Sequence, residues 1–306
     1  MTPWTFDSIP DQSGRTAIVT GANSGIGYEA ARALARKGAH VILACRDLAR
    51  AEAAARRLRD ERPAGRVEVL RLDLSDLESV REFAAQFAAA HARLDLLICN
   101  AGVMVPPESR TRQGFELQFG TNHLGHFALV GRLLPRVLAT PGARVVVVSS
   151  GVHHNGRIVL DDLDFRRRRY SAWRAYAQSK LANLLFALEL QRRLDRAGAG
   201  AIVTAAHPGW TATDLQRTAG LVRLLNPIFA MTPEAGALPT LRAATDPAAR
   251  GGDYFGPARF FEMNGPPVPA RISRRARDED MAARLWQISE ERTGVRFELP
   301  TRAAAA

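Results

Sequence analysis

The sequence predicts a doubly wound α/β fold, in which a central parallel sheet of about seven strands carries helices on both faces. Short runs rich in Val, Ile and Leu alternate with helical segments between residues 15 and about 210. These runs are apolar throughout, which is typical of parallel strands buried on both faces. A glycine-rich turn follows the first run, at residues 20–27. These observations together predict one sheet with right-handed crossover helices.

Each element follows from a local pattern. Asp76 is expected to cap a helix, Gly38 to end one, and Pro135 to kink or end one. The expected strands are 16–20, 40–45, 67–72, 94–99, 145–148 and 202–206. The expected helices are 26–37, 47–59, 76–91, 114–138, 172–196 and 278–293. After Pro208 the prolines weaken the periodicity, and 254–261, with four aromatic residues, is expected to supply strand seven and part of the core.

We expect a single domain over residues 1–306, because neither an internal repeat nor a linker-like change of composition divides the chain. Residues 14–215 are expected to form the cofactor-binding and catalytic core. Residues 210–300 are expected to form a substrate lid and a C-terminal extension. The lid would have an apolar lining that consists of Leu215, Leu221, Leu224 and Leu225.

The composition excludes several classes of protein. The formal net charge is +11, but the 42 basic residues, 40 of them Arg, are spread along the chain, which favours a solvated surface over nucleic-acid binding. Cys45 and Cys99 lie in apolar runs, so a disulfide scaffold is not expected. No segment has the length and apolar character of a membrane span or a secretory signal. We therefore expect a cytoplasmic protein with neither a membrane nor a nucleic-acid partner.

The glycine-rich turn predicts a dinucleotide site. Its glycines would let the backbone turn tightly and approach a pyrophosphate, which the free N–H groups of the next helix would bind. A plain tight turn between strand and helix is the alternative. The expected cofactor contacts in this loop are Gly21, Asn23, Ser24, Gly25, Ile26 and Gly27.

The end of the second strand predicts the choice of dinucleotide. Arg46 stands where an acidic residue would otherwise hold the ribose 2′-hydroxyl, and its guanidinium suits a 2′-phosphate. We therefore expect NADP(H) to be preferred over NAD(H). Asp47 could instead turn toward the ribose, or it could cap the following helix.

Further cofactor contacts are expected where the third and fourth strands end. Asp73 could reach the adenine amine, or it could be a turn residue, and Leu74 follows it. Asn100, Ala101 and Gly102 lie after the fourth strand, at the same edge of the sheet, where small residues would let the ribose lie against the backbone.

Four residues predict the catalytic site. Tyr176 and Lys180 are four residues apart on an expected helix and share one face, so the ammonium would lower the pKa of the phenol. Both are expected to contact the cofactor as well. Ser150, at the end of the fifth strand, would hold the substrate oxygen, with Ser149 as the alternative. The backbone carbonyl of Asn122 would bind a water that links Lys180 to solvent.

These motifs occur in one order, and in that order the sequence resembles the short-chain dehydrogenase/reductase family. They are TGxxxGxG at 20–27, NAG at 100–102, Asn122, Ser150, YxxxK at 176–180 and PG at 208–209. The resemblance implies a Rossmann fold. It also implies cofactor contacts from Pro208, Gly209, Thr211 and Thr213, the last toward the nicotinamide carboxamide.

Three shorter strings resemble the retinol-dehydrogenase-like and protochlorophyllide-reductase-like members of that family. They are ACRD at 44–47, VHH at 152–154 and YAQSKLAN at 176–183. This resemblance also implies NADP(H) and assigns the catalytic role to Ser150. Many retinoid enzymes carry a membrane anchor, which we do not find here, so a retinoid substrate is not expected.

The sequence thus predicts an NADP(H)-dependent oxidoreductase that transfers a hydride between nicotinamide and a carbonyl or alcohol, with Tyr176 as general acid/base. The substrate is expected to be a hydrophobic small molecule. The alternative is a non-catalytic NADPH-binding regulatory protein of the same fold. No metal is expected at His153 and His154, which have no third ligand at suitable spacing. The arginine run at 166–169 is either solvated surface or a contact for an anionic substrate, and both a homo-oligomer and a monomer remain open.

Overall fold

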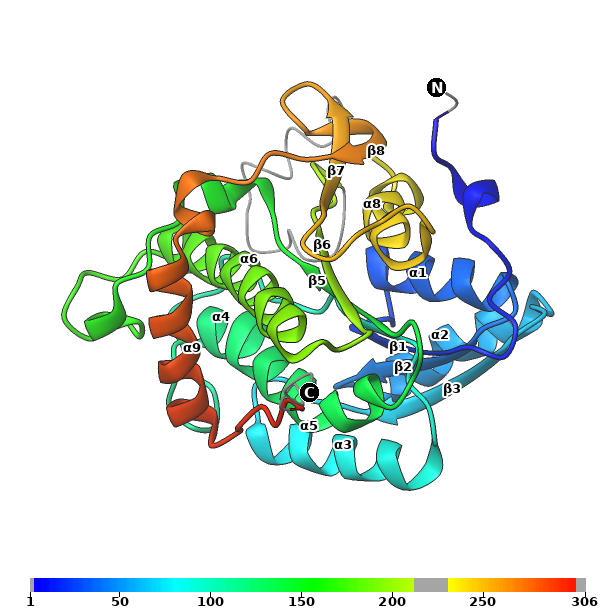
Figure 1. The fold of residues 1–306 in the computed structure, drawn as a ribbon, viewed down its shortest axis with the longest axis horizontal. Helices are drawn as coiled ribbons and strands as arrows, with labels where there is room; N and C mark the ends of the chain where they lie inside the picture. Colours follow the sequence, from blue (N-terminus) through cyan, green and yellow to red (C-terminus); the bar gives the residue numbers. More distant parts are fainter. Residues whose placement is uncertain (1–2, 212–230, 301–306) are drawn as a thin grey trace, which may run out of the picture.

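The protein is built on one eight-stranded sheet with the order β3-β2-β1-β4-β5-β6-β7-β8 (Figure 1). The computed structural model describes residues 3–211 and 231–300. All neighbouring strands are parallel except β7 and β8, which are antiparallel. The strands are β1 (Thr16–Thr20), β2 (His40–Cys45), β3 (Arg66–Arg71), β4 (Leu96–Cys99), β5 (Arg144–Val148), β6 (Ile202–Ala206), β7 (Tyr254–Arg259) and β8 (Asn264–Pro269).

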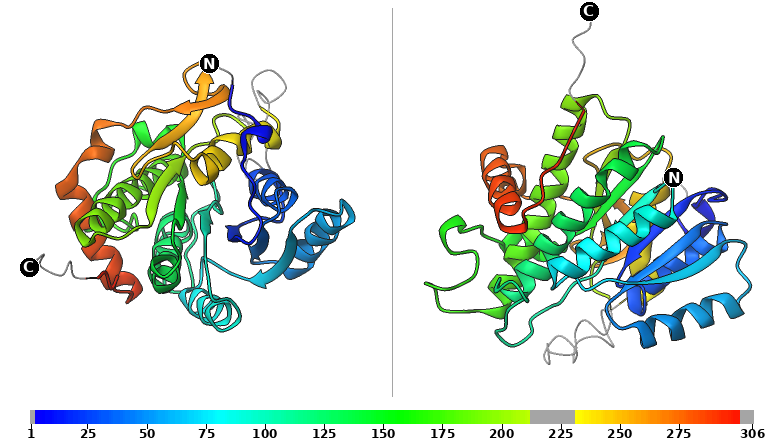
Figure 2. Two further views of the ribbon diagram at one scale, coloured as in Figure 1. Left: turned by 45° about the vertical axis from the view of Figure 1, so that its right-hand side comes forward. Right: turned by 90° about the horizontal axis from the view of Figure 1, so that it is seen from below.

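Helices cover both faces of the sheet, as the sequence predicts (Figures 1 and 2). Side chains alternate between the faces, so Ile18 belongs to the core cluster that includes residues of α3, α5 and α6. Ala17 and Val19 belong to the cluster on the other face, which includes residues of α1, α2 and α8. The longer helices are α1 (Gly25–Arg36), α2 (Leu48–Asp60), α3 (Leu77–Ala90), α5 (Gly125–Leu138), α6 (Ala172–Ala197), α8 (Pro233–Thr245) and α9 (Glu279–Thr293). The short helical turns are η1 (Phe6–Ser8), α4 (Leu117–Phe119), η2 (Gly120–Leu124), η3 (Gly151–Asn155), η4 (Leu160–Asp162) and η6 (Arg274–Arg277).

The sheet has one strand more than the sequence predicts. The extra strand, β8, contains Pro266, Pro267 and Pro269, and the sequence predicts no strand there. Proline cannot donate a ladder hydrogen bond, so it is tolerated mainly at the edge of a sheet. β8 occupies such an edge position, next to β7.

The helix expected at 114–138 is not continuous. A single turn, α4, leads into a π-helical turn, η2, and only then does α5 begin at Gly125. Pro135 lies inside α5 and does not end it. A π-helical turn inserts one extra residue into the helix, and such turns are frequent at functional sites. Asn122 lies in the middle of this one.

The aromatic segment at 254–261 divides between core and surface. Tyr254 and Phe255 are buried in β7, as expected. Phe260 and Phe261 are 65% and 97% exposed, so their assignment to the core is wrong. Both lie in the turn between β7 and β8 and have positive φ values, of 48° and 56°. The four leucines expected to line the lid lie outside the described residues.

The carboxyl ends of the parallel strands meet along one edge of the sheet. The register pairs Thr20 with Ala44, Val19 with Ile98, and Val148 with Ala206. The glycine-rich loop, residues 100–102, Ser150 and the PG segment follow these strand ends, so they gather where open α/β sheets bind ligands. Within the described residues, no helix combines the length and apolar character needed to cross a membrane.

Candidate active site

The glycine-rich loop joins β1 to α1 and needs glycine for two reasons. Gly21 has a φ of +67°, which side chains rarely adopt. A Cβ on Gly27 would lie 2.5 Å from both the Asn100 side-chain nitrogen and the Gly21 carbonyl oxygen. Ser24 caps α1 without a side-chain hydrogen bond, and the first turn of α1 holds no acidic residue. The positive end of α1 is therefore suited to a phosphate.

Thr20 ties the loops after β1 and β4 into one unit. Its Oγ1 accepts hydrogen bonds from the backbone N–H groups of Asn100 and Ala101, both at 2.9 Å. The Asn100 side chain donates to the Thr20 carbonyl at 2.9 Å. A Cβ on Gly102 would lie 3.0 Å from Asn122 Oδ1 and 3.7 Å from Lys180 Nζ. The predicted cofactor loop and the predicted catalytic residues are therefore direct neighbours.

Asn122 joins this loop to α6 through its side chain. Its Oδ1 accepts from the Val103 N–H at 2.8 Å, and its Nδ2 donates to the Val103 carbonyl and to Ser179 Oγ, each at 3.0 Å. Its backbone carbonyl accepts from His126 Nδ1 at 2.9 Å. The water expected on that carbonyl would have to use its second lone pair, so this role of Asn122 stays a prediction.

Tyr176 and Lys180 lie one turn apart on α6, and both side chains are buried. Lys180 Nζ lies 5.8 Å from the centre of the Tyr176 ring and donates to the Val148 carbonyl at 3.2 Å. Burial raises the pKa of Tyr176 to about 12, while a hydrogen bond with Ser150 acts to lower it. Burial lowers the pKa of Lys180 to about 8.

The expected lowering of the Tyr176 pKa by Lys180 is therefore wrong for this structure. Desolvation disfavours the charged form of each group, and here it dominates both pKa values. Only the hydrogen bond with Ser150 favours the phenolate. At neutral pH the site therefore holds a neutral phenol beside a lysine close to its own pKa.

The two serines after β5 have different surroundings. Ser149 is buried and donates its hydroxyl to the Lys180 carbonyl at 2.8 Å, which ties β5 to α6. Ser150 is half-buried, contacts Tyr176 and caps η3 through the Val152 N–H at 3.4 Å. Since Ser150 reaches the phenol, it is better placed than Ser149 to hold a substrate oxygen.

The hydrogen bonding after β2 shows which of the two predicted roles Asp47 has. The Asp47 carboxylate accepts from the Arg50 N–H at 3.1 Å and caps α2. Arg46 is exposed beside it, at the same edge of the sheet. The helix-capping alternative for Asp47 is therefore observed, and its carboxylate is used within the first turn of α2.

The residues after β3 are organised as a turn. Asp73 Oδ1 accepts from both the backbone N–H of Ser75, at 2.9 Å, and its hydroxyl, at 2.6 Å. Leu74 is buried, and its carbonyl would lie 2.3 Å from a Cβ on Gly125. The turn role of Asp73 is thus observed, whereas its contact with adenine stays a prediction.

The PG segment follows β6 at the same edge. Gly209 has a φ of +63°, and its N–H donates to His207 Nδ1 at 3.3 Å. The Thr211 hydroxyl donates to the Pro208 carbonyl at 2.8 Å. The structure thus places Pro208, Gly209 and Thr211 beside the other motifs, while Thr213 lies outside the described residues.

The sequence did not predict the hydrogen bonds that His126 makes between Asn122 and Thr20. A carbonyl only accepts, so Nδ1 of His126 carries the proton donated to Asn122, and Nε2 is left to accept from the Thr20 hydroxyl at 2.9 Å. Burial lowers the pKa of His126 to about 4, so the ring is neutral at physiological pH. His126 therefore connects the cofactor loop to Asn122. The fixed four-residue spacing from Asn122, on a helix, is the signal that could have indicated it.

His153 and the arginine run take part in local structure. His153 is buried, with Nδ1 2.8 Å from the Ser150 carbonyl and Nε2 accepting from the Ser273 N–H at 3.3 Å. Arg167 and Arg168 pair with Asp161 and Asp162, at 3.5 and 3.0 Å. Hydrogen bonds from the run lower the pKa of Asp162 to about 2. These contacts favour the surface interpretation of residues 166–169 over an anionic-substrate contact.

Comparisons with known proteins agree with this geometry. The family model for short chain dehydrogenase matches residues 15–221. The chain belongs to the short-chain dehydrogenase family. It is 43% identical to human retinol dehydrogenase 13 over 293 residues, which cover 92% of this chain and 85% of the relative. A crystal structure of an uncharacterized protein from Mycobacterium paratuberculosis is 48% identical, covers 97% of this chain and 100% of its own, and has a TM-score of 0.83.

Family membership settles the general activity. This short-chain dehydrogenase/reductase is an enzyme that acts on alcohol or carbonyl groups and binds a nicotinamide cofactor. A short-chain dehydrogenase from Shigella flexneri, complexed with NADP, is 27% identical with a TM-score of 0.64, covering 80% of this chain and 97% of its own. The comparisons give no support to the non-catalytic alternative.

Proposed function

We propose that the enzyme uses NADP(H) and that Tyr176 is its general acid/base. The observation that carries the proposal is the neighbourhood of Tyr176, Ser150 and Lys180 beside a loop suited to a phosphate. A short-chain dehydrogenase of similar fold was solved as a complex with NADP, which supports the cofactor.

The residues present fit an NADP molecule. The crowding at Gly27 brings α1 close to the loop after β4, and the first turn of α1 carries no acid that would repel a pyrophosphate. Arg46 is exposed beside that loop and would pair with the 2′-phosphate. Asp73, Leu74 and residues 100–102 would hold the adenosine and ribose, and Pro208, Gly209, Thr211 and Thr213 would border the nicotinamide.

The chemical roles follow from protonation and position. The bound nicotinamide would supply or accept the hydride at the carbinol carbon. Tyr176, with a pKa of about 12, is protonated at neutral pH and can donate to a carbonyl oxygen. Ser150 would hold that oxygen by a hydrogen bond, and Lys180 would orient the ribose. Lys180 would also return a proton to the Tyr176 phenolate, and a water on the Asn122 carbonyl would in turn reprotonate Lys180 from solvent.

We infer that the substrate is a hydrophobic alcohol or carbonyl compound. The relatives carry the name retinol dehydrogenase, which makes all-trans-retinal the first aldehyde to test. A panel of aliphatic and aromatic aldehydes of similar length would show whether the retinoid itself matters. Turnover of the panel with no turnover of retinal would agree with the prediction from the sequence.

Fluorescence titration with NADPH and with NADH tests the cofactor assignment. We expect NADPH to bind more tightly, and Arg46→Ser to weaken NADPH binding about tenfold or more with little effect on NADH, because a charge-assisted hydrogen bond contributes about 1.5–3 kcal/mol. Arg56→Ser is the matched control, since Arg56 is an exposed arginine within α2. Equal losses for both dinucleotides, or tighter NADH binding, would contradict the assignment.

A further inference from the structure

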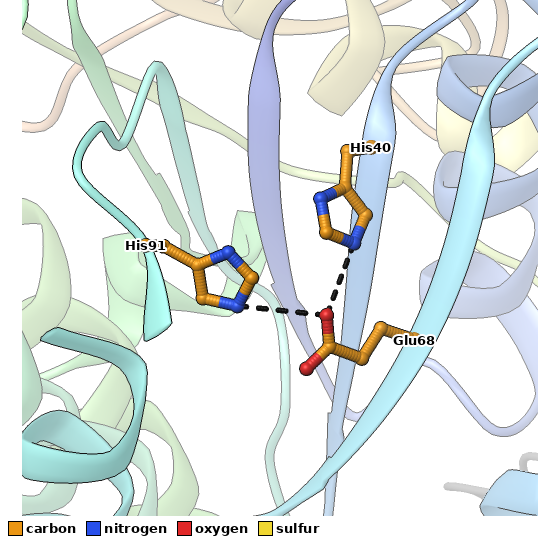
Figure 3. A group of neighbouring side chains, drawn as sticks. All are labelled: His40, Glu68 and His91. Atoms are coloured by element: carbon orange, nitrogen blue, oxygen red, sulfur yellow. Dashed lines mark ion pairs between the residues drawn. The ribbon is translucent and has the colours of Figure 1, made fainter. Parts of the chain in front are cut away.

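Two imidazoles and a carboxylate converge on one another (Figure 3). They lie toward the amino ends of the strands, whereas the catalytic residues lie at the carboxyl ends. His40 is the first residue of β2, Glu68 lies in β3, and His91 follows the end of α3. His40 Nε2 lies 3.0 Å and His91 Nε2 lies 3.5 Å from the same oxygen, Glu68 Oε2. One ligand atom from each residue lies within 4.8 Å of the other two.

The alternation of the strands explains why these side chains meet. His40, Ile42 and Ala44 share one face of β2, while Glu68 and Leu70 share the matching face of β3. Ile42, Ala44 and Leu70 pack in the core that α3 covers, so His40 and Glu68 face α3 as well. The chain leaves α3 at Ala90, and the His91 ring stacks on Phe87, with 4.7 Å between the ring centres. The sheet and α3 therefore hold the three residues in place.

The hydrogen bonding of this cluster is incomplete. Within the described residues, the buried Nε2 of His91 has no hydrogen-bond partner. A buried polar atom without a partner costs free energy and calls for an explanation, such as an ion or a water. This atom faces the Glu68 carboxylate and the His40 ring, as Figure 3 shows.

We propose that His40, Glu68 and His91 form a binding site for one divalent transition-metal ion, of which Zn²⁺ is the best match. Two imidazoles with one carboxylate favour zinc over the oxygen-seeking Mg²⁺ and Ca²⁺. Tetrahedral bonds of about 2.0–2.1 Å place neighbouring ligands about 3.3 Å apart, and the 3.0 and 3.5 Å separations bracket that distance. A water would complete the coordination.

The charges around the cluster affect how tightly it would bind a metal ion. Both imidazoles coordinate a metal in their neutral form, and Glu68 supplies the negative charge of the cluster. Arg66, which pairs with His40 in the β2–β3 register, is the nearby cation that opposes a second positive charge. Its side chain is exposed and free to turn toward solvent. Because the Arg66 charge opposes a bound cation, Arg66→Ala is expected to strengthen zinc binding.

The position of the site defines what zinc would do. Its ligands join the edge strand β3 to β2 and to the end of α3. The catalytic residues lie at the carboxyl ends of the strands, whereas this cluster lies toward the amino ends. Zinc bound here would stabilise the fold without touching substrate or cofactor. This inference does not depend on the proposed function.

Titration calorimetry of the chelator-treated full chain with Zn²⁺ tests the site. We expect one Zn²⁺ per chain, and a loss of affinity of about 100-fold for His91→Ala, His40→Ala and Glu68→Gln, because each variant removes one of three ligands. His154→Ala is the matched control, since it removes an exposed imidazole outside the cluster. It should bind as the wild type does, while Arg66→Ala should bind more tightly.

A thermal unfolding series keeps the test decisive if a variant folds poorly. Zn²⁺ should raise the Tm of the wild type and of His154→Ala but not that of Glu68→Gln, which closely preserves the size and shape of the side chain. Chelation should lower the Tm and leave kcat unchanged. Absence of binding, or equal binding by wild type and His91→Ala, would overturn the metal site. Loss of kcat on chelation would overturn its structural role.

Discussion

The two ends of the sheet hold their polar side chains in different ways. At the carboxyl end, Thr20, Asn122 and His126 pair with backbone groups at 2.8–3.0 Å, which fixes their positions. At the amino end, His40 and His91 converge on one carboxylate oxygen, and a buried nitrogen is left without a partner among the described residues. These three carboxyl-end residues are held by hydrogen bonds within the protein, whereas in our proposal a bound metal ion would complete the amino-end cluster.

The difference shows how each end would respond to substitution. Catalysis requires a site that is organised before substrate binds, so removal of one partner at the carboxyl end should reduce the rate. An ion bound at the amino end would join elements that the fold already places together, so its loss should appear as lower stability. Variants that change one quantity without the other therefore test the distinction between the two ends.

The largest effect is expected for Tyr176→Phe. This change removes the only proposed proton donor while it keeps the ring, so kcat should fall about 1,000-fold. The NADPH dissociation constant should change little, because the phenol hydroxyl contributes little to cofactor binding. Steady-state kinetics with an aldehyde, alongside an NADPH titration, measure both quantities. Turnover close to that of the wild type would refute the proton-transfer role of Tyr176.

A loss of activity combined with a gain in stability is expected for Lys180→Met. Activity should fall about 100-fold or more, because the residue that orients the ribose and supports Tyr176 is lost. Folding lowers the Lys180 pKa from 10.5 to about 8, so the buried charge destabilises the folded protein below pH 8. Without cofactor, Lys180→Met should therefore be more stable than wild type at pH 7, by about 3 kcal/mol, since each pKa unit corresponds to about 1.4 kcal/mol.

The pH dependence gives the sign of this effect. Between pH 8 and 10.5 the unfolded chain binds the Lys180 proton and the folded protein does not, so wild-type stability from this group rises with pH. The advantage of Lys180→Met should shrink across the same window, as measured by urea unfolding. Lys180→Arg, which keeps a permanent charge, is the control. It should have neither the activity of the wild type nor the added stability of Lys180→Met. A variant less stable than wild type at pH 7 would contradict the assignment.

A smaller effect is expected for His126→Phe, which removes both hydrogen bonds of the ring. The Asn122 carbonyl and the Thr20 hydroxyl would each lose one partner, so kcat should fall about tenfold, the equivalent of one hydrogen bond. Thr20→Val is the comparison, because it leaves the bond between His126 and Asn122 in place and should raise the NADPH dissociation constant more than it lowers kcat. Identical kinetic changes in the two variants would argue against separate roles.

Much of the carboxyl end could be predicted because its signals are local. Each apolar strand and the motif after it are contiguous, and the parallel register then brings Thr20, Ser150 and Pro208 to one edge without further information. The π-helical turn around Asn122 could not be predicted, since its apolar pattern matches an ordinary helix. The cluster at the amino end could not be predicted either. His40, Glu68 and His91 come from three separate elements, and only the packing of α3 on the sheet brings them together.

The smallest effect is expected for Asp47→Ala, and it separates structure from cofactor binding at the carboxyl end. Loss of the cap on the Arg50 N–H should reduce stability by about 1 kcal/mol. The preference for NADPH over NADH should not change, because the carboxylate is used within α2. Asp47→Asn should keep both properties, since asparagine caps helices as well as aspartate does. If NADH binding weakened in both variants while stability held, Asp47 would contact the ribose, and the helix cap would matter less than the structure indicates.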